Sequence, residues 1–279
     1  MDFTIEILPL IISLVCLGAF AGFLAGLLGV GGGIVLVPGL YYIFTYLQPN
    51  YGFDAAHIMH ICVGTSLAII VPTGLSSARS HHKKSSVDFD LIRFIGGGII
   101  VGVVCGTWVA SFLDAKSMKI IFASTILALA GMMVLGNTRF KVNAGQATPF
   151  KNVIAGYFIG GLSTLIGIGG ATLNVPYMSM HNVPMHRAVG SASAMGVIIA
   201  VPASIGFILI GLGLDNLPPF SIGYVSALAW LSITPISVMV APIGAHVAHK
   251  ISVKKLKVIF AVFMVLVALN MWQKILIGI

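Results

Sequence analysis

Residues 22–38 read GFLAGLLGVGGGIVLVP, and residues 160–176 repeat the pattern without a gap as GGLSTLIGIGGATLNVP. Eight of the seventeen aligned positions are identical, among them the proline that closes each copy. Each copy places a cluster of glycines inside an otherwise apolar run. Apolar segments interrupted at corresponding places in two halves of a chain are typical of membrane transporters, whose binding sites lie at the interruptions. We therefore expect a transporter whose site lies where the two copies meet.

Composition indicates a protein embedded in lipid. Of the 279 residues, 58% are hydrophobic and only 8% are charged, and the mean hydropathy is +1.07. Soluble domains carry about 25% charged residues, so this chain has too few charges to cover a surface that faces water. The three cysteines lie in apolar stretches without a Cys-x-x-Cys spacing, and we interpret them as small buried side chains.

The formal charge of +8 does not indicate a nucleic-acid partner. Basic residues cluster between apolar segments, at 79–84, 139–151 and 250–257. Lysine and arginine are enriched in the cytoplasmic loops of membrane proteins, so these clusters predict the cytoplasmic side. Both chain termini are then outside. Lys116 and Lys119 are exceptions to this charge pattern.

The apolar segments predict the helices. A helix needs about 20 apolar residues to cross a bilayer. Seven segments are long enough, namely 7–29, 57–79, 91–112, 117–137, 187–211, 220–246 and 255–277. Three shorter segments flank the glycine clusters, namely 34–47, 152–167 and 172–181. We predict an all-α integral membrane protein of about ten helical elements, with short broken helices at the glycine-rich breaks.

The elements divide into two sets of five. Residues 1–136 form the first predicted repeat, residues 137–151 a polar cytoplasmic linker, and residues 152–279 the second repeat. Because each set holds an odd number of elements, the second repeat is expected to be inverted relative to the first. The sequence leaves open whether the short helices span the membrane or re-enter on one side.

The glycine breaks are the first candidate binding elements. A break frees N–H groups at the start of the next helix, and a helix N-terminus attracts anions through these donors and its partial positive charge. A tight turn between packed helices is the alternative. The predicted substrate-binding residues at the breaks are Gly31, Gly32, Gly33, Gly169, Gly170 and Asn174.

Hydroxyl groups follow each break. Thr65 and Ser66 open one long apolar segment, and Ser191 and Ser193 open the corresponding segment of the second half. Their hydroxyl groups are candidate donors to an oxyanion. Alternatively, they bond back to carbonyl groups of their own helix. Prolines inside the same segments are expected to kink them and to expose backbone groups.

His57, His60 and Arg79 are candidates for gating or proton relay. The two histidines are three residues apart and share a helix face, and neutral imidazole relays protons or binds metal. Only Asp54 lies nearby, so no metal site is predicted, and packing at a helix end is the alternative. No Asp or Glu lies deep in an apolar segment, so any ion coupling must use histidine, backbone carbonyls or the substrate's own proton.

The chain lacks the motifs of several enzyme classes. It has no Walker loop, nucleophile elbow or paired carboxylates, so neither ATP use nor hydrolysis is predicted, and no cofactor is expected. Other glycines recur every four residues, a spacing that lets membrane helices approach closely. These predicted packing positions are Gly18, Gly22, Gly26, Gly98, Gly102 and Gly106.

The motifs resemble those of the TauE/SafE family of sulfite exporter-like permeases. The resemblance rests on GLLGVGGGIVLVP at 26–38, LIGIGGA at 165–171 and VGTSLA at 63–68, and it covers nearly the whole chain. It implies the transport of sulfite, an organosulfonate or a similar small oxyanion across the bacterial cytoplasmic (inner) membrane. The second half departs from the Gly-Thr-Ser pattern and reads Ser-Ala-Ser.

The expected partners are therefore a small anionic substrate and the lipid bilayer, and the expected mechanism is alternating access. A gated anion channel is the main alternative. A membrane protein that handles metal through the paired histidines is a weaker one. Homo-oligomerisation is left open by the sequence.

Overall fold

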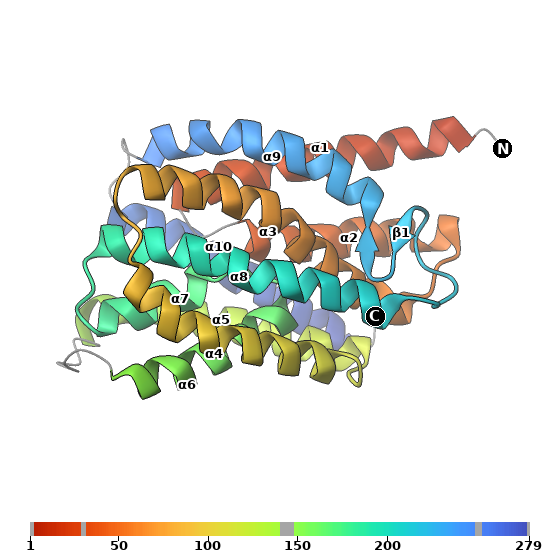
Figure 1. The fold of residues 1–279 in the computed structure, drawn as a ribbon. Helices are drawn as coiled ribbons and strands as arrows, with labels where there is room; N and C mark the ends of the chain where they lie inside the picture. The colour runs from red at the N-terminus through yellow and green to blue at the C-terminus, as the bar shows by residue number, and fades with distance from the viewer. Residues whose placement is uncertain (1–2, 29–31, 140–147, 249–252, 278–279) are drawn as a thin grey trace.

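The chain folds almost entirely into helices. The computed structural model describes residues 3–28, 32–139, 148–248 and 253–277, and these residues form ten α-helices (Figure 1). The prediction of an all-helical chain with about ten elements is confirmed. The helices are α1 (Phe3–Leu28), α2 (Gly33–Tyr51), α3 (Ile58–Lys83), α4 (Phe89–Ala110), α5 (Ala115–Arg139), α6 (Pro149–Ile166), α7 (Ala171–Met180), α8 (Met185–Gly211), α9 (Ala227–Ala248) and α10 (Val253–Ile277).

Seven of the described helices are long and apolar enough to cross a membrane, which confirms the seven long segments expected from the sequence. They are α1, α3, α4, α5, α8, α9 and α10. The other three, α2, α6 and α7, flank the glycine breaks. Helix α7 has only ten residues, a length of about 15 Å at 1.5 Å per residue. That is half of the hydrocarbon thickness of about 30 Å.

The boundary of α9 differs most from the expected one. We expected this helix over 220–246, but it begins at Ala227. The preceding residues form a short antiparallel hairpin of β1 (Ser221–Ile222) and β2 (Val225–Ser226). Gly223 makes the turn with a φ of 53°, a conformation that glycine adopts without the steric cost of a side chain. The expected boundary was therefore wrong by the length of the hairpin.

The predicted linker is shorter than expected. Helix α5 continues to Arg139 and α6 begins at Pro149, so 140–148 separate them, of which 140–147 lie outside the described part. Thr148 caps α6 by accepting the N–H of Lys151 at 3.4 Å. Proline suits the first position of a helix because the N–H that it lacks has no partner there.

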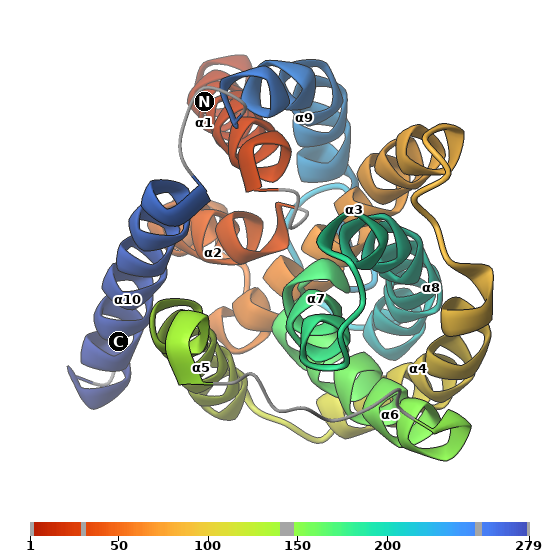
Figure 2. The ribbon, with the colours of Figure 1, turned by 90° about the vertical axis from the view of Figure 1, so that its left-hand side faces the viewer.

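The helices form interleaved pairs around a central group. Helix α1 packs along α9, α6 along α4, and α5 along α10. Figure 2 looks nearly along the helices and shows the first two pairs on opposite sides of the bundle, with α2, α3, α7 and α8 between them. Helix α3 is the most buried of the seven long helices, with 67% of its most apolar window inside the protein.

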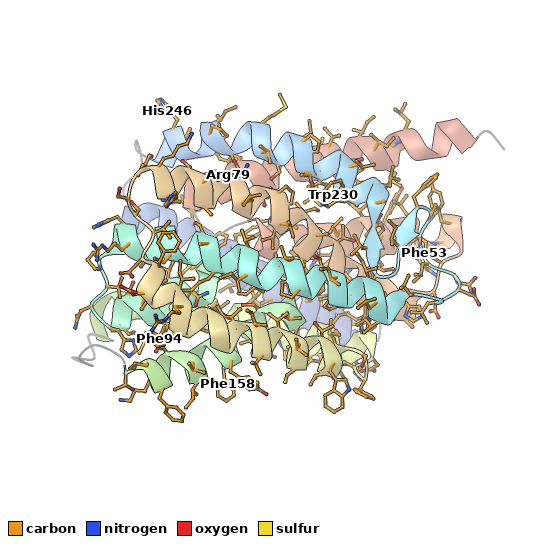
Figure 3. The ribbon with its side chains drawn as sticks, in the orientation of Figure 1. Phe53, Arg79, Phe94, Phe158, Trp230 and His246 are labelled. Atoms are coloured by element: carbon orange, nitrogen blue, oxygen red, sulfur yellow. The ribbon has the colours of Figure 1, made fainter. Side chains whose placement is uncertain are left out.

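The outer surface carries large apolar side chains. Phe158 on α6 is 67% exposed and points away from the bundle (Figure 3). Trp108 on α4 and Leu266 on α10 are exposed to a similar degree. A soluble protein rarely presents apolar patches of this extent to water. These side chains are therefore the part of the surface that lipid covers.

Glycines let the paired helices approach until their backbones touch. A Cβ atom at Gly98 or Gly102 of α4 would run into the carbonyl groups of Val153 or Tyr157 of α6. Across the other pair, a Cβ at Gly22 would lie 2.5 Å from the carbonyl oxygen of Ser237 in α9. Both contacts are possible only because glycine has no side chain. The packing interpretation is confirmed for Gly18, Gly22, Gly98, Gly102 and Gly106.

Replacing Gly102 by alanine is expected to lower the stability of the folded protein, because the new methyl group would force α4 away from α6. Overpacking of this kind costs about 1–3 kcal/mol. Gly97→Ala is the matched control on the same helix, since a Cβ there meets nothing within 4 Å. Thermal melting of the detergent-purified variants measures the difference. Equal melting temperatures would contradict a close contact at Gly102.

Candidate functional site

The two glycine breaks touch each other. A Cβ atom at Gly33, the first residue of α2, would lie 2.7 Å from the carbonyl oxygen of Gly167 and 3.0 Å from the Cα of Ile168. The start of α2 therefore packs directly on the turn between α6 and α7. Gly31 lies outside the described residues. The sequence copies that suggested a shared site are adjacent in space at the residues that the structure describes.

The second break is built by two helix ends. Helix α6 ends at Gly167, which adopts the left-handed conformation with a φ of 66° and donates its N–H to Ser163. Helix α7 then starts with Gly170 as its N-cap, so no side chain caps its first amides. Gly169 and Gly170 are buried. The break therefore places an uncapped helix N-terminus inside the protein.

Unpartnered polar groups surround this N-terminus. Asn174, in the first turn of α7, is 0% exposed, and neither its Oδ1 nor its Nδ2 has a hydrogen-bond partner among the described residues. The hydroxyl groups of Thr172 and Ser163 also lack partners there. A Cβ at Gly170 would be 2.8 Å from the Asn174 Nδ2 and 3.0 Å from the backbone nitrogen of Gly196 in α8. The carboxamide thus lies directly beside the backbone of the break.

Such groups are costly. A buried polar group without a hydrogen bond destabilises a folded protein by about 1–3 kcal/mol, and native proteins contain few of them. A ligand with hydrogen-bonding groups of its own would satisfy the three side chains gathered at this helix N-terminus. Asn174 was predicted from its place in the repeat, whereas Thr172 and Ser163 were missed as binding candidates.

The first break has no comparable polar group. Gly32 is the N-cap of α2 and, like Gly170, provides no side-chain cap. Its carbonyl oxygen accepts the N–H of Leu36 at 2.9 Å. Leu36 occupies the position that Asn174 holds in the second copy. The N-caps of α2 and α7 are therefore alike in lacking a side-chain cap, and the two helix starts differ in chemistry.

Only one of the four candidate hydroxyl groups reaches the breaks. Ser66 is fully buried and donates to the carbonyl oxygen of Gly167 at 2.8 Å. Ser193 donates to Val189 in its own helix at 3.0 Å and accepts from Ser77 at 3.2 Å. The first of these Ser193 bonds follows the alternative considered above, in which a helical serine bonds back to its own backbone.

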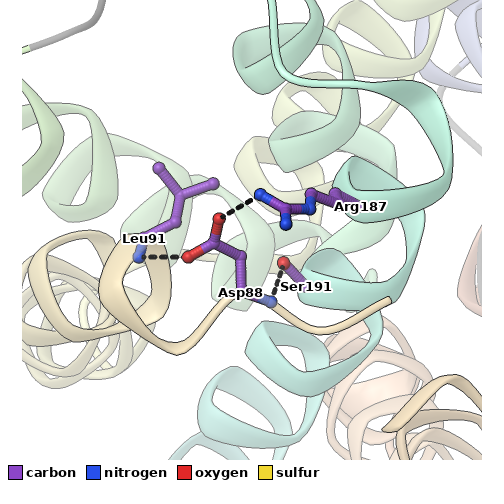
Figure 4. A network of polar contacts seen from close by, with 4 residues as sticks. All are labelled: Asp88, Leu91, Arg187 and Ser191. Atoms are coloured by element: carbon purple, nitrogen blue, oxygen red, sulfur yellow. Dashed lines mark hydrogen bonds and ion pairs between the residues drawn. The ribbon is translucent and has the colours of Figure 1, made fainter. Parts of the chain in front are cut away.

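Thr65 and Ser191 hold the chain segments that lead into α9 and α4. The Thr65 hydroxyl accepts the N–H of Ser226 at 2.9 Å, and the Ser191 hydroxyl accepts the N–H of Asp88 at 2.9 Å. Figure 4 shows the second contact, in which Asp88 also caps α4 through the N–H of Leu91. Arg187 lies 3.6 Å from the other carboxylate oxygen of Asp88. Each hydroxyl group therefore fixes the start of a helix from the opposite half of the chain.

His57 and His60 meet at a residue that the sequence did not single out. The Tyr224 hydroxyl lies 3.0 Å from His57 Nδ1, and the Tyr224 ring stacks on His60 with the centroids 4.9 Å apart. Burial raises the pKa of Tyr224, and the charge of Asp54 raises it further, so the hydroxyl keeps its proton. Tyr224 lies in the hairpin before α9, which no motif links to the histidines.

His60 also ties α3 to the end of α4. Its Nε2 lies 3.1 Å from the carbonyl oxygen of Ala110, and its buried Nδ1 has no partner among the described residues. A carbonyl only accepts, so Nε2 carries the proton. In the described part of the chain, no group of three or more His, Cys, Asp or Glu side chains is arranged to hold a metal ion. The histidines thus pack at a junction of three elements.

Pro72 and Arg79 lie farther along α3. Pro72 has no N–H, which deprives the carbonyl oxygen of Ala68 of its helical donor. Trp230 of α9 donates its Nε1–H to this carbonyl oxygen at 3.0 Å. The backbone expected to be exposed by this proline is therefore hydrogen-bonded by the protein. Arg79 lies on α3 toward the end of the bundle opposite the N-terminus (Figure 3) and lines a groove together with Pro72.

Comparison with known proteins gives consistent results. The sequence model of the family described as "Sulfite exporter TauE/SafE" matches residues 14–271. A "Probable membrane transporter protein" of Haemophilus influenzae is 37% identical over 264 residues, which are 94% of this chain and 98% of that protein. "Probable membrane transporter protein MJ0441" of Methanocaldococcus jannaschii is 28% identical over 263 residues, covering 92% of this chain and 93% of its own. No solved structure matches.

Removing the Thr65 hydroxyl is expected to destabilise the fold. Thr65→Val keeps the shape of the side chain and leaves the buried N–H of Ser226 without its acceptor, at a cost of about 1–3 kcal/mol. Thr73→Val is the matched control, because the Thr73 hydroxyl donates only within its own helix, to Ile69 and Ile70. Melting temperatures in detergent compare the two variants. An equal loss in both would mean that the bond to Ser226 contributes nothing.

Proposed function

This chain belongs to the sulfite exporter TauE/SafE family, and from that premise we propose that it moves a small sulfur-containing anion across the cytoplasmic membrane of a bacterium. The family is one of membrane transporters and not of enzymes. The seven candidate spans make the chain a multi-pass membrane protein. Sulfite, an organosulfonate or a similar oxyanion is the proposed substrate.

The observation that carries the proposal is the state of Asn174. Its fully buried carboxamide has no partner among the described residues and lies beside the uncapped start of α7. The Nδ2 group supplies two N–H donors, and the first turn of α7 supplies backbone N–H donors and a partial positive charge. An anion bound here would satisfy these groups together. We propose that Gly169, Gly170 and Asn174 form the centre of the site.

The distribution of carboxylates favours an anion over a cation. Every aspartate in the described part lies at a helix end or in a connecting segment, and none approaches the breaks; these residues are Asp54, Asp88, Asp90, Asp114 and Asp215. A cation buried in a membrane protein usually needs a negative partner. Donors without a nearby carboxylate suit an oxyanion.

The other candidate residues take supporting places in the proposed site. Ser66 fixes the Gly167 carbonyl, Gly33 provides the backbone that packs against the second break, and Gly32 is the N-cap of α2. Thr65, Ser191 and Ser193 already have partners in this conformation, so a role for them in binding requires a change of partner during transport. His57, His60 and Arg79 remain proposed gating groups at the two ends.

We further propose that the two halves are inverted repeats. The contacts support this view. If α1–α5 correspond to α6–α10, the pair α1–α9 corresponds to the pair α6–α4, and the pairs α3–α8 and α5–α10 each correspond to themselves. The bonds from Thr65 to Ser226 and from Ser191 to Asp88 form a matching pair. In both cases a hydroxyl of one half holds the start of the fourth helix of the other half.

Alternating access follows from this arrangement. The residues of the second break are all buried, so the site is closed to solvent in this conformation. The pairs α1–α9 and α4–α6 lie on opposite sides of the central helices (Figure 2). A displacement of one pair relative to the other would open the breaks to one face of the membrane at a time. This movement is proposed by analogy with other inverted-repeat carriers.

The test is flux through proteoliposomes. Wild-type protein is expected to transport one or more of sulfite, thiosulfate, taurine and sulfoacetate, and Asn174→Leu is expected to reduce that flux at least about tenfold, since a hydrogen bond to a charged group contributes about 1.5–3 kcal/mol. The variant should melt no lower than wild type, because it removes unpartnered polar atoms. Flux is measured with and without a pH gradient.

Asn270→Leu is the matched control. Asn270 lies on α10 away from the breaks, where its Oδ1 accepts from Tyr42 at 2.7 Å, and its replacement should leave flux close to that of wild type. Full activity of Asn174→Leu would refute the proposed site. Electrical recordings with unsaturable currents far above carrier turnover would mean that the protein is a channel and not a carrier.

A further inference from the structure

A groove of about 450 Å³ runs along one face of α3, at the end of the bundle that carries the basic clusters. All the described residues that line it come from this helix, at the three- and four-residue spacing of a single face. They are Pro72, Leu75, Ser76, Arg79, Ser80 and Lys83.

The chemistry of the groove changes along its length. Its inner end is apolar, with Pro72 and Leu75, and its outer part carries the hydroxyl groups of Ser76 and Ser80 and the positive charges of Arg79 and Lys83. The ion pair found among the described residues joins Arg187 to Asp88. Neither Arg79 nor Lys83 therefore takes part in an ion pair with a described residue. No described carboxylate lines the groove. Such a face is costly against lipid tails and stable in contact with water and anions.

The inner end lies next to the proposed transport site. Ile70 is two residues before Pro72 and is 2% exposed. A Cβ atom at Gly33 would lie 3.1 Å from the Ile70 Cδ1, and one at Gly169 would lie 3.3 Å from its Cγ2. Ile70 therefore contacts both breaks, and the groove begins two residues farther along the same helix, on a different face of it.

The volume suits a hydrated anion. Water occupies about 30 Å³ per molecule in the liquid, so the groove is large enough for a small oxyanion and several waters. Arginine binds oxyanions with two parallel N–H groups, and lysine adds a point charge. The two cations are four residues apart on the helix, about 6 Å along its axis. That spacing lets both act on one doubly charged oxyanion.

We infer that the α3 groove is a second anion-binding site, which receives a doubly charged oxyanion from the cytoplasm before it moves to the glycine breaks. This inference rests on the proposed function, because it assumes that the breaks are the next stop for the anion. A positive groove raises the local concentration of its anion and speeds association. The same cations also suit a lipid phosphate group, which is the alternative source of this chemistry.

Binding tests the groove independently of transport. Calorimetric titration of the purified wild-type protein with thiosulfate, in detergent without anionic lipid, should show saturable binding. Asn174→Leu should retain the weaker, groove-dependent part of this binding, whereas Arg79→Gln combined with Lys83→Gln should remove that part. Retention of the full binding isotherm by the double variant would overturn the inference.

Transport gives the second measurement. With thiosulfate applied to the cytoplasmic face of oriented proteoliposomes, the double variant should raise KM about tenfold, because the groove acts through local concentration. For singly charged methanesulfonate the increase in KM should be smaller. Arg93→Gln is the matched control, an exposed arginine on α4 at the same end of the bundle that does not line the groove.

The outcomes separate the two proposals. Normal thiosulfate transport and an unchanged KM in the double variant would overturn the groove and leave the proposed function intact. Failure of wild type to transport any sulfur anion, with groove-dependent thiosulfate binding present, would overturn the proposed function alone. Lipid binding is measured in nanodiscs that contain phosphatidylglycerol. If the double variant loses bound lipid there and its thiosulfate binding is unchanged, the groove binds lipid and the inference is overturned.

Discussion

Hydrocarbon offers no hydrogen bonds, and this constraint accounts for much of the structure. Each interruption of a helix inside the membrane frees backbone groups that the protein itself must satisfy. At Pro72 the freed carbonyl of Ala68 is satisfied by Trp230 of another helix. At the starts of α9 and α4, hydroxyl groups of Thr65 and Ser191 accept the backbone N–H groups of the capping residues. Thr65, Ser191 and Trp230 thus act as partners for interrupted backbone.

The turn between α6 and α7 departs from this rule. Ser66 satisfies the Gly167 carbonyl, yet the side chains of Asn174, Thr172 and Ser163 are left without partners in the described part of the protein. At Pro72 and at the starts of α4 and α9, by contrast, the protein supplies partners for the interrupted backbone. Unpartnered donors kept here at a cost in stability are what the proposed binding site requires.

The sequence predicted the features that depend on local composition. The seven long helices, the three short ones and the glycine contacts at four-residue spacing follow from hydropathy and from the absence of side chains. The sequence did not predict the contacts between distant segments. Nothing near Tyr224 in the chain indicates its contacts with His57 and His60, and nothing near Thr65 indicates Ser226. Lys119, an exception to the charge pattern, lies 5.5 Å from the ring of Tyr41, a position that the sequence does not reveal.

The interleaving of α1 with α9 constrains how the chain is made. Helix α1 leaves the ribosome long before α9, and its glycine-lined face has no partner until α9, which begins at Ala227, has been synthesised. At about 5–20 residues per second, that delay is roughly 10–40 s. During this time the translocation machinery or an insertion chaperone must shield the first helix from other nascent chains. Biogenesis thus includes a late docking step of α9 on α1. A ribosome that stalls before α9 leaves α1 without its partner helix, as a substrate for the quality-control proteases.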